Sequence, residues 1–301
     1  MRTLSFVLIF LVVLSACDSG KKPSIEEITS EEEADSTASE TIIDPELIAA
    51  ILQQIPSPLE ISVLLQRSGT KYDGSLLNNP DNTSKYNSNY QKAINLGIYG
   101  TDLGYTNIYE QNQDGLEFMS AISTLAEGLS IGQFFELATI GRLATNSKNL
   151  DSLLLITTQN FNNINAHLQE QDRSNLSVLL LVGGWLEALH VTCQVSAKDP
   201  SNQELIDVIG EQKIILEQLE LLLSFYSTKN PNMKDLHESF LRLKTAYDEI
   251  EITIIPGEPV SKVVDGVLII ENTDRSEVKI TQENVDNITS IVEEIRTKAI
   301  N

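Results

Sequence analysis

The residues best placed to do chemistry are Glu187, His190 and Cys193, which follow one another at intervals of three. On a helix, such spacing places the carboxylate, imidazole and thiol on one face. Glu-x-x-His is half of the ligand set used by di-iron helical bundles. A second copy is missing, because Lys234 stands three residues before His237. We therefore expect no metal and no cofactor. Glu187 and His190 stay weak metal candidates, and we interpret them as a polar pair in a buried helix.

A second set of polar residues lies on the segment from Tyr90 to Tyr109, which has the length of one helix. Its members are Asn95, Tyr99, Asp102, Tyr105 and Tyr109. One interpretation is a pocket that recognises a small ligand through tyrosine hydroxyls and a carboxylate. The other is a satisfied polar network that fixes how a loop at 70–82 packs on this helix.

Asp102 distinguishes these two interpretations. Apolar residues flank it, and a buried carboxylate without partners is costly, so we expect it to be partly buried and hydrogen-bonded. Asn95, Tyr105 and Tyr109 are the expected donors. A structural network predicts that Asp102→Asn lowers stability by about 1–3 kcal/mol. A binding site predicts unchanged or improved stability, because functional polar groups are often held at some cost to the fold.

The same segment carries Gly97, Gly100 and Gly104, spaced to share one face. A glycine inside a helix costs about 1 kcal/mol relative to alanine, so three on one face predict the close approach of another backbone. We expect one helix over 83–111. Replacing Gly100 by leucine should then overpack that face and destabilise the fold.

Catalytic motifs and a nucleic-acid surface are both missing from the sequence. It contains neither a Walker-type phosphate loop nor a Gly-x-Ser-x-Gly nucleophile elbow. The formal net charge of −22 leaves no basic face for phosphate backbones or anionic lipid heads. We predict that the protein is not an enzyme and does not bind nucleic acid.

Residues 1–16 have the features of a signal peptide. Arg2 is a positive start, and Leu4 to Leu14 is an uncharged apolar run, shorter than the roughly 20 residues that a spanning helix needs. The motif Leu14-Ser15-Ala16-Cys17 then resembles a bacterial lipobox. The resemblance implies cleavage before Cys17 and lipidation of that cysteine.

Residues 17–43 are predicted to be the lipidated cysteine followed by a disordered acidic tether. They are rich in Ser, Thr and Glu and contain no aromatic residue, so they cannot bury enough surface to fold. We expect a lipid-anchored, extracytoplasmic protein of the bacterial cell envelope. The outer membrane is preferred over the inner, and the leaflet is left open. With Cys17 lipidated, Cys193 has no disulfide partner in the chain.

Residues 44–255 are predicted to be one mainly α domain, an irregular bundle of about eight helices. Beyond a helix that starts at Asp44-Pro45, helices are expected near 57–67, 83–111, 114–127, 131–144, 149–171, 175–197, 201–226 and 230–255. A solenoid of helical pairs is the alternative, although no 34-residue period is visible. The segment 175–197 is apolar nearly all round, which indicates a buried central helix.

Residues 256–301 are predicted to be a small ββα appendage. Short strands are expected at 266–270 and 277–280, followed by an amphipathic helix capped by Thr281. Its apolar side carries Val285, Ile288, Val292, Ile295 and Ala299. A lone two-stranded hairpin is only marginally stable, so we expect the appendage to dock on the helical domain.

Four stretches stand between Ile55 and Gln113: Pro56-Ser57-Pro58-Leu59-Glu60, Leu77-Asn78, Lys85-Tyr86, and Ala93-Ile94-Asn95-Leu96-Gly97-Ile98-Tyr99-Gly100-Thr101-Asp102-Leu103. Through them, residues 55–113 resemble a family of uncharacterised helical bacterial envelope lipoproteins. The resemblance covers a minority of the chain and implies no activity.

These observations predict a lipid-anchored envelope protein that acts as a non-catalytic binding or scaffold module. The alternative is a periplasmic lipoprotein that binds a small solute or a metal. The expected partners are the membrane, through the lipid on Cys17, and another envelope protein.

Overall fold

The fold is taken from a computed structural model that describes residues 48, 50–52, 55, 57–135, 150–228, 230–257, 259–264, 267–271 and 275–301. The chain divides into two units, 1–41 and 42–301, and the described residues belong to the second. The predicted signal peptide, Cys17 and the acidic tether lie outside them. So do the expected start of a helix at Asp44 and most of the helix expected at 131–144.

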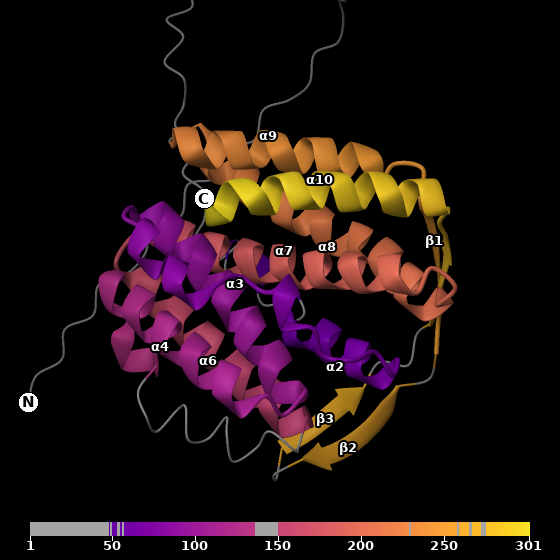
Figure 1. The fold of residues 1–301 in the computed structure, drawn as a ribbon, viewed down its shortest axis with the longest axis horizontal. Coiled ribbons are helices and arrows are strands. Elements are labelled where there is room, and N and C mark those ends of the chain that lie inside the picture. The colour runs from indigo at the N-terminus through magenta and orange to yellow at the C-terminus, as the bar shows by residue number, and fades with distance from the viewer. Residues whose placement is uncertain are drawn as a thin grey trace, which may run out of the picture. The chain divides into compact units, whose positions relative to one another are not determined.

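The described residues are mainly helical, as the sequence predicts (Figure 1). The helices are α2 (Leu59–Arg67), α3 (Asn89–Ile108), α4 (Asn112–Gly128), α6 (Leu150–Glu170), α7 (Ser174–Lys198), α8 (Gln203–Ser227), α9 (Pro231–Ala246) and α10 (Gln282–Ile300). Short 3-10 turns are η1 (Gly74–Leu76), η2 (Pro80–Lys85) and η3 (Gly132–Phe135).

Capping residues determine where several helices begin. Ser88 and Gln91 form a capping box, so α3 starts at Asn89 and not at residue 83 as predicted. Thr281 caps α10 as predicted, together with Asn284. Asn230 caps α9, where its side chain accepts from two backbone N–H groups. These caps satisfy N–H groups that the first turn of a helix leaves without partners.

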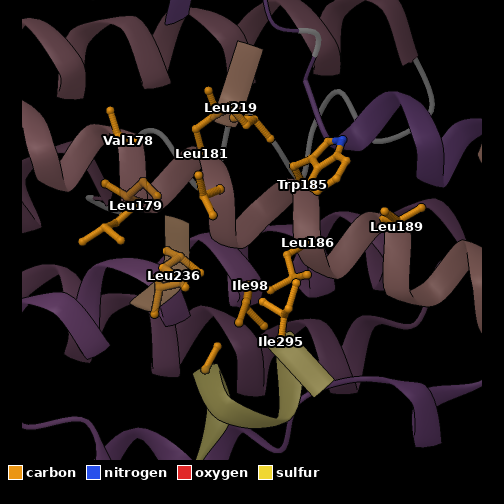
Figure 2. Packing of buried hydrophobic residues seen from close by; sticks show 14 of the residues in the cluster. Ile98, Val178, Leu179, Leu181, Trp185, Leu186, Leu189, Leu219, Leu236 and Ile295 are labelled. Carbon is orange, nitrogen blue, oxygen red and sulfur yellow. The ribbon is translucent and has the colours of Figure 1, made fainter. Parts of the chain in front are cut away.

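Helix α7 is the centre of the core, as its composition predicts. It packs against α2, α3, α6, α8 and α10, and Figure 2 shows side chains of α3, α8, α9 and α10 gathered around its own. Repeats of a solenoid contact only their neighbours, so this fold is a bundle. Among the described helices, α7 alone is long and apolar enough to cross a membrane, but its apolar window is entirely buried in the fold.

Close packing of α3 on α7 explains two of the glycines. A Cβ on Gly97 would lie 2.0 Å from the carbonyl oxygen of Leu180, and one on Gly183 would lie 2.0 Å from that of Ile94. The predicted approach of another backbone is therefore confirmed at Gly97. It is wrong at Gly100, which is exposed and where a Cβ would meet nothing within 4 Å. Overpacking at Gly100 is no longer expected.

The glycine face of α3 meets a side chain at Gly104, one turn after Gly100. A Cβ on Gly104 would lie 2.6 Å from Cδ1 of Leu59, on α2. Gly104 therefore accommodates α2, while Gly97 accommodates α7. The glycine face of α3 is thus tight at both ends and open in the middle.

The described C-terminal residues form four strands, whereas the sequence predicts two, at 266–270 and 277–280. β1 (Glu251–Ile255) pairs antiparallel with β4 (Arg275–Lys279), and β2 (Val260–Val264) pairs antiparallel with β3 (Val267–Glu271). The helix predicted over 230–255 ends at Ala246 because Glu251–Ile255 is dense in β-branched residues, which favour strands. Ile254 is 57% exposed as a result.

Helix α10 follows these strands and docks on the bundle. It packs against α9, α7, α8 and α3, and Figure 1 shows it running beside α9. Its predicted apolar residues are all buried: Val285, Ile288, Val292, Ile295 and Ala299. This helix also brings a charged residue, Arg296, into the interior.

Candidate functional site

The polar residues that the sequence singles out on α3 bond to the loop before that helix. The tyrosine contacts are Tyr99 OH donating to Asn79 O at 2.8 Å, Tyr105 OH accepting from Asp73 N at 3.3 Å, and Tyr109 OH at 2.7 Å from Thr70 Oγ1. Each contact joins α3 to residues 70–82. In the binding-pocket interpretation these hydroxyls contact a ligand. In the structure they instead hold the loop at 70–82.

Asn78 lies at the centre of the contacts between loop and helix and is 2% exposed. Its backbone N–H donates to Oδ2 of Asp102 at 3.2 Å. Its side-chain amide lies 3.1 Å from Tyr86 OH and 3.3 Å from Oδ1 of Asn95. The amide of Asn95 in turn donates to the carbonyl of Ala299 in α10 at 2.8 Å. The network thus joins the loop, α3 and α10.

Asp102 is hydrogen-bonded, as expected, but it is fully and not partly buried, and its partners are not those predicted. Neither Asn95 nor the tyrosine hydroxyls donate to it. Its Oδ1 atom has no donor among the described residues, and the side chain that faces it is Glu187 of α7. Two buried carboxyl groups therefore meet between α3 and α7.

Glu187 pairs with Arg296 of α10 and not with His190. The guanidinium Nε and Nη2 atoms each donate to one oxygen of Glu187 at 2.6 Å, and Nη2 also donates to the carbonyl of Leu76 at 3.0 Å. Arg296 is 9% exposed and Glu187 is fully buried. A bidentate pair of this kind is the strong form of a carboxylate–guanidinium contact.

One guanidinium cannot neutralise two buried carboxylates. Because both oxygens of Glu187 are bonded to Arg296, the proton of the pair belongs on Asp102. Burial, followed by the negative charge of Glu187, raises the pKa of Asp102 well above its ordinary value. Protonated Asp102 can donate from Oδ1 to Glu187 while its Oδ2 accepts from Asn78.

His190 and Cys193 take no part in a metal site in this arrangement. Burial, followed by the charge of Arg296, lowers the pKa of His190 to about 4, so the ring is neutral, and its Nδ1 atom has no hydrogen-bond partner among the described residues. Burial raises the pKa of the Cys193 thiol to about 12. Within the described ranges, no group of three His, Cys, Asp or Glu side chains could hold a metal ion.

A separate feature is an apolar cavity of about 210 Å³ beside the open middle of the glycine face. Side chains of α2, α3, α4, η3, α6 and α7 line it, and no lining residue in the described part of the chain is charged. Gly97, Gly100 and Gly104 form part of its wall. Gly100 and Thr158 are exposed, so the cavity reaches the surface at that side.

Sequence reasoning missed Arg296, Asn78 and the cavity. Arg296 had a usable signal, because it stands four residues after Val292 and three before Ala299, on the apolar stripe of α10. A charged residue there predicts a buried partner. Asn78 and the cavity had none, because both depend on segments far apart in the sequence.

Comparisons with known proteins leave the chain without a family assignment. No protein-family model, curated protein or solved structure matched it. The likeness of residues 55–113 to envelope lipoproteins therefore stays a prediction.

Proposed function

We propose that this protein is a lipid-anchored envelope protein that binds a ligand or partner and does not catalyse a reaction. The observation that carries the proposal is the uncharged cavity between α2, α3, α4, α6 and α7. Concave, mostly apolar sites with a few polar groups are the usual form of small-molecule sites. The cavity is the candidate binding site.

The ionisable groups nearest the protein centre support a role without catalysis. Glu187 is bonded to Arg296 through both of its oxygens, Asp102 accepts from the backbone of Asn78, and burial keeps His190 neutral. None of them lines the cavity. A catalytic acid or base must reach a substrate within hydrogen-bond distance, and these side chains are used to join α3, α7 and α10.

The anchor in this proposal is the lipid on Cys17, which places the protein at the bacterial cell envelope. Cys17→Ser should abolish lipidation and leave the precursor uncleaved at this position. Labelling cells with a fatty-acid analogue measures lipidation, and the mass of the total protein measures cleavage, since the processed and unprocessed forms differ in mass. Incorporation of the label into the Cys17→Ser variant would contradict the anchor assignment.

Native mass spectrometry of the protein purified from its own host tests the binding role. A bound small apolar molecule is the expected result. A bound partner protein would support the scaffold role within the same proposal. A stoichiometric metal or a polar solute would favour the alternative of a periplasmic solute- or metal-binding lipoprotein.

A further inference from the structure

We infer that the cavity beside Gly100 binds the single unbranched alkyl chain of a small amphiphile whose head group is uncharged. This inference rests on the proposed function, because it names the ligand class for the same site. The lining residues of the cavity, its volume, its opening and its charge each restrict which class of ligand can bind.

Aliphatic side chains are prominent in the lining of the cavity. Nine of the described lining residues are leucine or isoleucine, including Leu59, Leu96, Ile122 and Leu180. Flat aromatic rings contribute little, with Phe135 and Phe161 at one side. The burial of methylene groups in a cavity of this composition is energetically favourable.

The size fits one short chain. An apolar cavity of about 150 Å³ stays dry and binds benzene, and this one is about 210 Å³. Since a methylene group is about as large as a water, at roughly 30 Å³, the cavity holds about seven of them. A phospholipid with two long chains is therefore too large to enter whole.

The opening and the charge restrict the head group. Gly100 and Thr158 are exposed at the mouth, and Asn160 and Asn162 also line the cavity. Amides and hydroxyls can hydrogen-bond a hydroxyl head group, whereas the lining residues that the structure describes include no cation to compensate a carboxylate. The formal net charge of −22 adds repulsion for any anion.

The test uses the chain from Asp18 onward, which contains all described residues, and titrates n-alkanols from butanol to decanol calorimetrically. Each added methylene should tighten Kd by about fourfold. The gain in affinity per methylene should level off at about seven carbons, where the cavity is full. Alkanoates of equal length should bind more weakly.

Gly100 supplies the matched variants, because it lines the cavity and a Cβ there would meet no atom within 4 Å. Gly100→Ala adds one carbon and should weaken octanol binding about fourfold. Gly100→Leu adds four carbons and should weaken it about 200-fold. Circular dichroism and thermal melting check that both variants fold.

Toluene is the second probe, and it separates the ligand class from the binding role. Alkanol binding that levels off and is lost in Gly100→Leu supports the inference. Toluene binding that is lost in Gly100→Leu, with no alkanol binding, overturns the alkyl assignment but leaves a binding site. If neither probe binds, or if Gly100→Leu binds like the wild type, both the alkyl assignment and this site for the proposed function are wrong.

Discussion

Replacing Asp102 by asparagine tests the charge arrangement at the centre of the fold. Asparagine has nearly the same shape, can accept from Asn78 through Oδ1, and can donate to Glu187 through its amide. The one property it removes is titration. The sequence alone predicts a loss of about 1–3 kcal/mol from this change, but the facing Glu187 makes the effect depend on pH.

The direction in which stability changes with pH follows from proton linkage. The carboxyl has an ordinary pKa of 3.8 and a much higher one in the folded protein. Between those values the folded state binds a proton that the unfolded state does not. The stabilisation from Asp102 is therefore complete below pH 3.8 and is lost as pH rises toward the folded pKa.

The magnitude is set by how much of the pH interval lies below the folded pKa of Asp102. One pH unit is worth about 1.4 kcal/mol for one proton, so from pH 5 to pH 7 the wild type should lose at most about 2.7 kcal/mol that Asp102→Asn does not. Contributions of all other titrating groups are common to both proteins and cancel in the difference. The difference in unfolding free energy should thus move in favour of the variant, by no more than about 2.7 kcal/mol.

Urea denaturation of the two proteins at pH 5, 6 and 7, followed by circular dichroism, measures this difference. Asp81→Asn is the matched control, because Asp81 is exposed on η2 and its replacement removes one negative charge without touching the buried network. A difference that stays constant from pH 5 to pH 7 would show that Asp102 is ionised in the folded protein. The assignment of the shared proton would then be wrong.

Three further predictions follow from packing and burial. Gly97→Ala should cost about 1–3 kcal/mol, because the new methyl group would meet the backbone of α7, whereas Gly100→Ala should gain about 0.5–1 kcal/mol; equal melting temperatures would contradict the packing of α3 on α7. In the chain from Asp18, the Cys193 thiol should react with a disulfide reagent only when the protein unfolds, since it is 1% exposed with a pKa of about 12; rapid labelling of the native protein would refute its burial. Elemental analysis should find no stoichiometric transition metal, because both oxygens of Glu187 are bonded to Arg296; one metal per chain, lost in Glu187→Ala, would promote the metal-binding alternative.

Local patterns in the sequence were sufficient to predict most helices. The apolar segment 175–197 predicts the central helix α7, and Asn230 and Thr281 predict the starts of α9 and α10. These signals work because caps and apolar periodicity act within a few residues of the chain. The prediction of a helix failed at Glu251–Ile255, where β-branched residues favour a strand and pair with β4.

The glycines of α3 show the limit of such patterns. Their spacing correctly predicts a close backbone at Gly97, but the same spacing says nothing of Gly100, where the neighbouring helices leave a cavity. A helix face is a property of one segment. The space beside it depends on which other segments pack there.

By itself the sequence determined the helical class, the central position of α7 and the burial of Asp102, since each follows from the solvation of nearby residues. The tertiary structure alone decided that Glu187 pairs with Arg296, 109 residues away, and that burial beside Glu187 raises the pKa of Asp102. It also decided that an uncharged cavity opens beside Gly100. Ion pairing and cavity shape depend on distances between segments, and those distances exist only once the helices have packed.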